Sequence, residues 1–422
     1  MERITLAPGA HINVLPAEKF NRCRISINFI WPATREWATA EALLPFVLER
    51  GYQGCPDMTE LSKKLARLYG AALSVDGTMS GQSRVLTVSL SGIRDAFALA
   101  GESLSREYAD IAFGTAFEPY RVDDVLDAEA VAIEKEQLRE LLESEINEKR
   151  SYCIRQARRK FYGDSPAGIE RNGYLDEVDG LTADAVTQAY ERMVQQAQIE
   201  VFVLGADVDA VVQQLRAALA GRRRAPQALP APTAVPVGQT RSFEEPLPTA
   251  QGKLCMLFTP GEPFAPQELS ALRVAVALLG GTATSRLFQN VREKQSLCYY
   301  CAASYTSLTG ALCVDSGVEH VNAAAARDSI LKELAALCGG PIGDGELSDT
   351  KRALKNQLAA VGDTLQGLEG WYFAEQMRGA DKTPEQVSAE VDAVTADDVR
   401  RVLSRFSLSV CYTLTKEAGA DA

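Results

Sequence analysis

The chain carries an internal repeat. Val178 to Met193 reads VDGLTADAVTQAYERM and Val391 to Phe406 reads VDAVTADDVRRVLSRF, and the two align without gaps at an offset of 213 positions with seven identities in sixteen. The order of expected elements repeats on both sides of the middle of the chain as well: a strand, two helices, a strand, further helices and a last strand. This repetition predicts two domains of similar fold that arose by duplication.

The hydrophobic periodicity places these elements. Alternating or continuous apolar runs predict strands at 24–30, 83–90, 199–205, 253–258, 311–318 and 407–414. Apolar residues at helical spacing predict helices at 40–48, 58–68, 96–108, 124–161, 267–279, 285–294, 321–337 and 345–376. Because strands and helices interleave without strict βαβ alternation, we expect two α+β domains and no doubly wound parallel sheet.

One segment differs in composition from the rest. Residues 222–248 contain six prolines and almost no hydrophobic periodicity, which predicts a semi-extended linker. We therefore expect a first repeat over residues 1–221 and a second repeat over residues 249–422.

Charge and composition exclude several kinds of partner. The 422 residues carry a formal net charge of -12 without a large basic block, which argues against nucleic acid as a partner. The first residues lack the basic and apolar regions of a secretory signal, and no run of about 18 apolar residues occurs. We expect a cytoplasmic protein without membrane contact, whose nine scattered cysteines are reduced core residues.

Two further segments resemble the insulinase/pitrilysin family of zinc peptidases, the inverzincins, and the resemblance extends over essentially the whole chain. Leu279 to Tyr299 reads LGGTATSRLFQNVREKQSLCY, similar to the family's second-repeat signature of a glycine pair, S-R-L-F, R-E-K and a tyrosine seven residues after the arginine. Glu134 to Gly180 is similar to the first-repeat run of a long helix, F-x-G-x-x-P-x-G and V/I-x-x-L/V-T. The resemblance implies two homologous α+β repeats, each an antiparallel-rich sheet packed with helices, forming one half of a clamshell.

The zinc-binding motif of the family is absent. Active members bind zinc through an inverted H-x-x-E-H helix, and the resemblance places Ala42, Pro45 and Phe46 at its histidine, glutamate and histidine positions. The whole chain has two histidines, His11 and His320, so no pair at i, i+4 exists. A catalytic zinc needs about three protein ligands, and hydrolysis also needs a general base. The resemblance therefore implies a chain without zinc or a general base.

The family's third zinc ligand is a glutamate on the following long helix. This position aligns with Leu141, and the neighbouring Glu140 and Glu143 leave the assignment open between them. Neither alternative restores a site in which the other two ligands are missing.

The residues that replace the motif predict packing. Ala42, Leu43, Phe46 and Val47 fall at helical spacing, so we expect an apolar core patch at the former metal position. Pro45 fits if the helix begins near Ala42, because the first amides of a helix have no intrahelical partner.

Arg292 and Tyr299 match family residues with a chemical role. The resemblance implies that they contact the substrate backbone and the developing oxyanion at a zinc site. A guanidinium and a phenol suit this role because both are donors that stabilise negative charge. The alternative is that Arg292 pairs with a local acid and Tyr299 packs in a half-buried strand.

Cys298 and Cys301 form a C-x-x-C. Two functional interpretations of this motif are a metal site completed by Cys313 and His320, and a redox motif. We favour buried thiols, because residues three apart in a strand point to opposite faces.

Taken with the family resemblance, these residues predict a catalytically inactive subunit of a heterodimeric peptidase. A zinc-bearing homologue would supply the metal, and the pair would enclose a peptide or an unfolded segment. Similar pairs process peptides, and the YfmF-like degenerate members are linked to the modification pathway of elongation factor P. The alternative is a structural or scaffolding subunit without a role in proteolysis.

Overall fold

The computed structural model describes residues 1–416, which divide into two compact units. Each unit consists mainly of one half of the chain and receives a short segment from the other half. Among the described residues, unit 1 contains residues 1–143, 169–230 and 364–369, and unit 2 contains residues 144–168, 231–363 and 370–416.

Unit 1 is a six-stranded sheet in the order β1-β2-β8-β3-β5-β4. All neighbouring strands are antiparallel except β2 and β8, which run parallel. The strands are β1 Glu2–Ala7, β2 Ala10–Leu15, β3 Arg22–Pro32, β4 Ala72–Ser80, β5 Ser83–Ile93 and β8 Gln198–Leu204.

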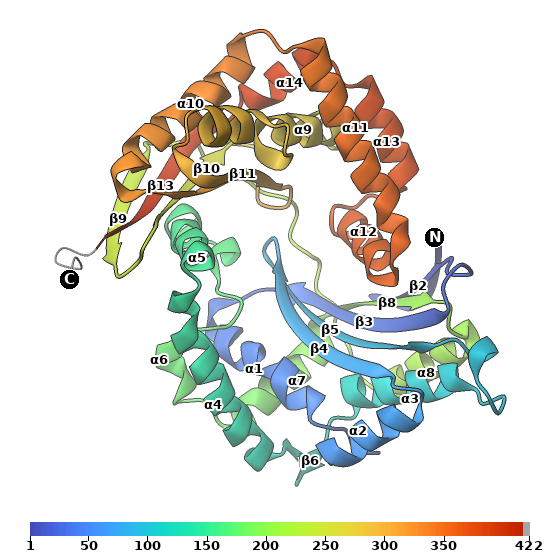
Figure 1. Cartoon of the computed structure of the whole chain (residues 1–422). Helices are drawn as coiled ribbons and strands as arrows, with labels where there is room; N and C mark the ends of the chain where they lie inside the picture. The colour runs from blue at the N-terminus through green and yellow to red at the C-terminus, as the bar shows by residue number, and fades with distance from the viewer. Residues whose placement is uncertain (417–422) are drawn as a thin grey trace. The chain divides into compact units, whose positions relative to one another are not determined.

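Helices cover one face of this sheet (Figure 1). Ile25, Ile27 and Phe29 of β3 point into the core beneath them, each fully buried. The helices are α1 Ala38–Glu49, α2 Met58–Arg67, α3 Leu104–Phe117, α4 Ala128–Ser144, α6 Leu175–Val178, α7 Ala183–Gln196 and α8 Val208–Leu219, and β6 Arg121–Val122 pairs with β7 Val125–Leu126.

The alternate residues of β3 make the opposite face of the sheet polar, because successive side chains in a strand point to opposite sides. Ser26 and Asn28 are buried there, and Ser26 donates a hydrogen bond to Glu369 at 2.6 Å. Arg24 forms an ion pair with the same carboxylate. Glu369 lies in the segment that the second half of the chain supplies to unit 1.

Unit 2 is a five-stranded sheet in the order β11-β12-β10-β13-β9. Its parallel pair is β9 and β13, and the other pairs are antiparallel. The strands are β9 Arg241–Leu247, β10 Gly252–Thr259, β11 Cys298–Thr306, β12 Ala311–Val318 and β13 Ser407–Lys416.

Both faces of the second sheet are apolar. Leu254, Met256 and Phe258 of β10 lie in one core, and Cys255 and Leu257 lie in another on the opposite face. The second core is closed by α5 Lys149–Tyr162, which comes from the first half of the chain (Figure 1). The remaining helices are α9 Leu269–Val276, α10 Ala323–Gly339, α11 Asp344–Ala360, α13 Pro384–Ala393, α14 Ala396–Leu403 and α12 Leu365–Met377, whose first turn belongs to unit 1.

The two sheets share one topology. The order β2-β8-β3-β5-β4 in unit 1 corresponds to β9-β13-β10-β12-β11 in unit 2, including the position of the parallel pair. Thr182 and Thr395, which are separated by the repeat offset, both cap a helix with their side chains. The predicted duplication of an α+β fold is confirmed.

Three details differ from the sequence-based expectation. The helices expected over 124–161 are present as α4 and α5, separated at Glu145–Glu148, whereas the single helix expected over 345–376 divides into α11 and α12. The expected linker 222–248 ends in β9, which pairs with β13 through backbone groups and needs no side-chain periodicity. Strands β1, β2 and β4 were not expected.

Candidate functional site

Helix α1 carries the residues that the family resemblance places at the metal positions. Ala42 is 5% exposed, Pro45 is buried and Phe46 packs partly buried against the core of unit 1. Leu43 and Val47 belong to the same core. The predicted apolar patch is therefore present, and its side chains contain no atom that can coordinate a metal ion.

Pro45 lies in the interior of α1, so the expected helix start near Ala42 is wrong. The helix begins at Ala38, a full turn earlier. A proline at this place cannot donate a backbone hydrogen bond to the carbonyl of Glu41. Its ring packs toward β4, where a Cβ built on Gly77 would come within 3.0 Å of the Pro45 Cγ. This packing is possible because residue 77 is a glycine.

Glu41, directly before the degenerate motif, is a buried acid that sequence reasoning missed. It is 1% exposed, and its carboxylate accepts hydrogen bonds from Trp31 Nε1 at 2.8 Å and from Arg192 at 2.7 Å. The buried Arg84 guanidinium is 3.9 Å away. Burial raises the pKa of Glu41, and Arg84 opposes that rise. This cluster fixes α1 against β3, β5 and α7.

Leu141, which the resemblance aligns with the third-ligand position, lies exposed on α4, as do the alternatives Glu140 and Glu143. The buried acid of this helix is Glu134, which accepts a hydrogen bond from Arg50 at 2.7 Å. Glu134 lies about two helical turns before Leu141, and this spacing is the sequence feature that could have identified it.

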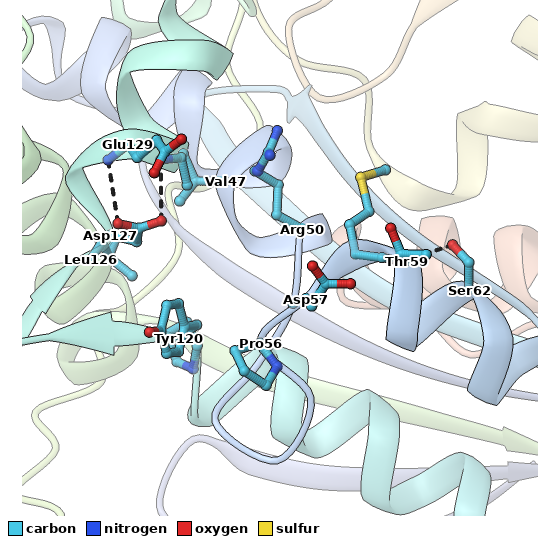
Figure 2. A pocket seen from close by; sticks show the side chains of 14 residues that line it. Val47, Arg50, Pro56, Asp57, Thr59, Ser62, Tyr120, Leu126, Asp127 and Glu129 are labelled. Carbon is cyan, nitrogen blue, oxygen red and sulfur yellow. Dashed lines mark hydrogen bonds between the residues drawn. The ribbon is translucent and has the colours of Figure 1, made fainter.

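A cavity of about 640 Å³ opens beside the C-terminal end of α1 (Figure 2). Polar residues of its wall already have structural partners. Asp57 caps α2 by accepting from the Glu60 amide, Asp127 accepts from two amides at the start of α4, and Arg50 pairs with Glu134. Asp57, Asp127 and Arg50 thus serve local structure at this cavity.

Arg292 and Tyr299 lie together at a second cavity, of about 410 Å³, within unit 2. Arg292 is on the π-helical segment η7, Leu287–Lys294, and Tyr299 is on β11. Both are accessible, since Tyr299 is 48% exposed and the Arg292 side chain is 38% exposed. Cys298 and Glu319 also line this cavity.

Each of the two residues has a local acidic partner. Arg292 is 3.1 Å from the Glu293 carboxylate and stacks over the Phe288 ring, 4.5 Å from its centroid. The Tyr299 hydroxyl donates a hydrogen bond to Glu319. Both ion pair and hydrogen bond are exposed, and exposed pairs of this kind contribute at most about 1 kcal/mol. Displacing either contact would therefore cost little free energy.

Cys298 and Cys301 share a face of β11, so the expectation that they point to opposite sides is wrong. Cys298 pairs with Val318 and Tyr300 pairs with Gly317, so Tyr299 is an extra residue in the β11–β12 ladder. Such a β-bulge changes the alternation of the strand. Both cysteines consequently belong to the core of unit 2.

Over residues 1–416, no helix is long and apolar enough to cross a membrane. Within the same range, no three or more His, Cys, Asp and Glu side chains are grouped so that they could hold a metal ion.

Comparison with known proteins gives consistent results. Residues 180–354 match the family model for the peptidase M16 inactive domain. The chain is 27% identical over 417 residues to the probable inactive metalloprotease YmfF of Bacillus subtilis strain 168, which covers 98% of this chain and 97% of that protein.

Solved structures share the fold. A conserved protein from Enterococcus faecalis V583 is 26% identical with a TM-score of 0.89, over 99% of this chain and 98% of that chain. A peptidase M16 inactive domain protein from Pseudomonas fluorescens is 16% identical with a TM-score of 0.77, over 99% and 98% of the two chains.

Proposed function

Because the chain is an inactive member of the insulinase/pitrilysin (M16) peptidase family, we propose that it is the non-catalytic subunit of a heterodimeric zinc peptidase. A homologous chain with an intact H-x-x-E-H helix supplies the zinc ion and the general base. This chain has no cofactor of its own. It encloses a peptide or an unfolded segment together with the partner and contributes Arg292 and Tyr299 to the partner's site.

The observation that carries this proposal is the contrast between two places in the chain. At the degenerate metal positions of α1, Ala42 and Pro45 are buried in the core of unit 1. Arg292 and Tyr299, by contrast, are accessible at one cavity of unit 2. An exposed guanidinium and an exposed phenol at one cavity are suited to stabilising negative charge in a neighbouring site.

The sheet edges support a peptide as the ligand. Strand β11, which carries Tyr299, is an edge strand of the unit 2 sheet, and β4 is an edge strand of the unit 1 sheet. An extended peptide can bind such an edge through main-chain hydrogen bonds. A peptide strand along β11 would run past the Tyr299 bulge, where the two donors are located.

A role in the cytoplasm is part of this proposal. Two pathways fit a paired peptidase of this kind, the maturation of a peptide and the modification of elongation factor P. The identity of the copurifying partner distinguishes them.

A scaffolding subunit is the second candidate. The observation that favours it is that Glu293 and Glu319 already engage Arg292 and Tyr299. In that case the cavity would serve only local packing, and substitutions at either residue would leave proteolysis by a partner unchanged.

Copurification from the native cell tests the proposal first. We expect a homologue with an intact H-x-x-E-H motif in stoichiometric amounts, and the reconstituted pair should hydrolyse a peptide that neither chain hydrolyses alone. Recovery of the chain with a non-peptidase complex, and without such a homologue, would support the scaffolding role.

A further inference from the structure

The cavity beside Arg292 also exposes one edge of the C-x-x-C pair. We propose that Cys298 and Cys301 form an oxidation site, at which a hydroperoxide attacks Cys298 and the thiol of Cys301 closes the disulfide. This inference is independent of the partner and of zinc, and it is tested on the chain alone.

The β-bulge at Tyr299 provides the geometry. In a regular strand, side chains three residues apart lie on opposite faces. The extra residue between Cys298 and Tyr300 places both sulfurs on the core side of β11, over Ser316 and Val318 of β12. A disulfide between the two cysteines requires that both sulfurs lie on one side of the strand, and the bulge meets this requirement.

The two cysteines differ in access and in acidity. Cys298 lines the open cavity of about 410 Å³ and is 9% exposed, while Cys301 is 5% exposed and is not part of the cavity wall. The hydrogen bond from the Cys301 thiol, followed by the hydroxyl of Ser316 and the charge of Arg292, lowers the pKa of Cys298 to about 7 against the effect of burial. The hydrogen bond with Cys298 and burial raise the pKa of Cys301.

Charged groups near the two cysteines lower the pKa of Cys298 and raise the pKa of Cys301. Arg292 on η7 favours the Cys298 thiolate, and Glu293 and Glu319 also line the cavity. Asp315 on β12 raises the pKa of Cys301 and so helps that residue to remain a proton donor. A reactive thiolate beside a protonated resolving thiol is the arrangement of redox-sensor cysteine pairs.

The reaction balances in two steps. The Cys298 thiolate attacks hydrogen peroxide, an S–O bond forms as the O–O bond breaks, and the hydroxide that leaves takes up a proton to become water. The Cys301 sulfur then attacks the sulfenic acid, an S–S bond forms, and its proton leaves with the hydroxyl group as a second water. Two thiols are oxidised by two electrons, and one peroxide is reduced.

A second cysteine pair in the same unit is a matched control. The sulfurs of Cys255 and Cys313 are 3.7 Å apart. Cys255 is fully buried, and its hydrogen bond with Cys313 and its burial raise its pKa well above the ordinary value. Neither residue lines any of the three cavities described in residues 1–416. Cys255 and Cys313 lie close together, but the pKa of Cys255 is raised, so we expect this pair to react slowly.

The experiment treats the reduced full-length chain with hydrogen peroxide at neutral pH, blocks the remaining thiols and maps disulfides by mass spectrometry. We expect a disulfide between Cys298 and Cys301 that forms at least about tenfold faster than one between Cys255 and Cys313. Cys301→Ser should stop at a sulfenic acid on Cys298, which dimedone traps. Cys298→Ser should give neither product.

The opposite pattern would overturn the proposal. Equal oxidation of both pairs, faster oxidation of Cys255, or dimedone labelling of Cys301 in Cys298→Ser would each show that Cys298 has no special reactivity. Circular dichroism of both serine variants checks that the fold is retained.

Discussion

The hydroxyl of Tyr299 donates a hydrogen bond to the carboxylate of Glu319, so the donor proposed for the partner's oxyanion is held by an acid until substrate arrives. This relationship predicts opposite effects for two substitutions. Tyr299→Phe removes the donor and should lower kcat of the reconstituted pair by about 10²-fold. Glu319→Gln weakens the competing acceptor and removes a negative charge, and should raise kcat a few-fold.

The measurement is peptide hydrolysis, with assembly checked by gel filtration. The effect should fall on kcat more than on KM, because the donor is aimed at charge that develops in the transition state. Wild-type turnover by Tyr299→Phe would make the scaffolding role the better account.

Arg292→Ala should lower kcat of the pair by about 10²- to 10³-fold, since a guanidinium near a developing oxyanion is felt mainly in the transition state. Lys294→Ala is the matched control, because Lys294 ends the same segment η7, is exposed and donates a hydrogen bond to Asn290. Equal losses in the two variants would indicate a general effect of surface charge on assembly.

The purified chain should carry no stoichiometric zinc, because Ala42, Pro45 and Phe46 offer no ligand atoms. Elemental analysis after dialysis against a weak chelator measures the content. One tightly held zinc per chain that disappears on mutating Cys298, Cys301 or His320 would contradict this prediction and point to a thiol site.

The effect of Gly77→Ala on the free energy of unfolding should depend on whether residue 45 is proline. The added methyl would lie about 3.0 Å from the Pro45 Cγ, and overpacking of this kind costs about 1 kcal/mol or more. In a Pro45→Ala background the space is open, and the substitution should be neutral or stabilising because alanine has less backbone entropy to lose. Urea unfolding of the four proteins gives the coupling, and an equal effect in both backgrounds would rule out the contact.

Glu49→Gln should stabilise the protein at neutral pH and lose this advantage in acid. Burial, followed by the charges of Asp76 and Glu134, raises the pKa of Glu49 above its ordinary 4.5. The folded chain thus holds this proton more tightly than the unfolded chain does, so stability falls as the pH rises through that range. Glutamine keeps an acceptor for the Val75 amide and removes the charge.

The readout is the difference in Tm between variant and wild type from pH 5 to pH 8. It should grow as the pH rises, and Glu36→Gln, at an exposed position, is the control for the substitution itself. A gain from Glu49→Gln that is the same at every pH would refute the electrostatic cause.

The duplicated fold and the two places of functional interest were visible in the sequence, whereas several local geometries were not. The repeat at Thr182 and Thr395 and the run from Arg292 to Tyr299 are local patterns with local signals. The early start of α1 depends on tertiary contacts of Glu41 with β3 and α7. Pro45 is consequently tolerated at a position that its backbone alone would not favour.

Features that depend on the pairing of strands distant in the sequence could not be predicted from local sequence patterns. The bulge at Tyr299 exists only in the register with β12, and β9 is a strand only because β13 lies beside it. The same reason hid the relation between Cys298 and Cys301, whose spacing alone indicates opposite faces.

Each unit contains a short segment from the other half of the chain, and this exchange constrains the order in which the two units can fold during synthesis. Unit 1 needs Glu369 to neutralise Arg24 and to accept from Ser26, and that residue leaves the ribosome long after the rest of the unit. Helix α5 is synthesised early, and its apolar side stays exposed until β10 and β13 have been synthesised and pack against it. The nascent chain therefore cannot finish its first half before its second half is almost fully translated, and a polypeptide cut between the halves would leave each fragment short of a part.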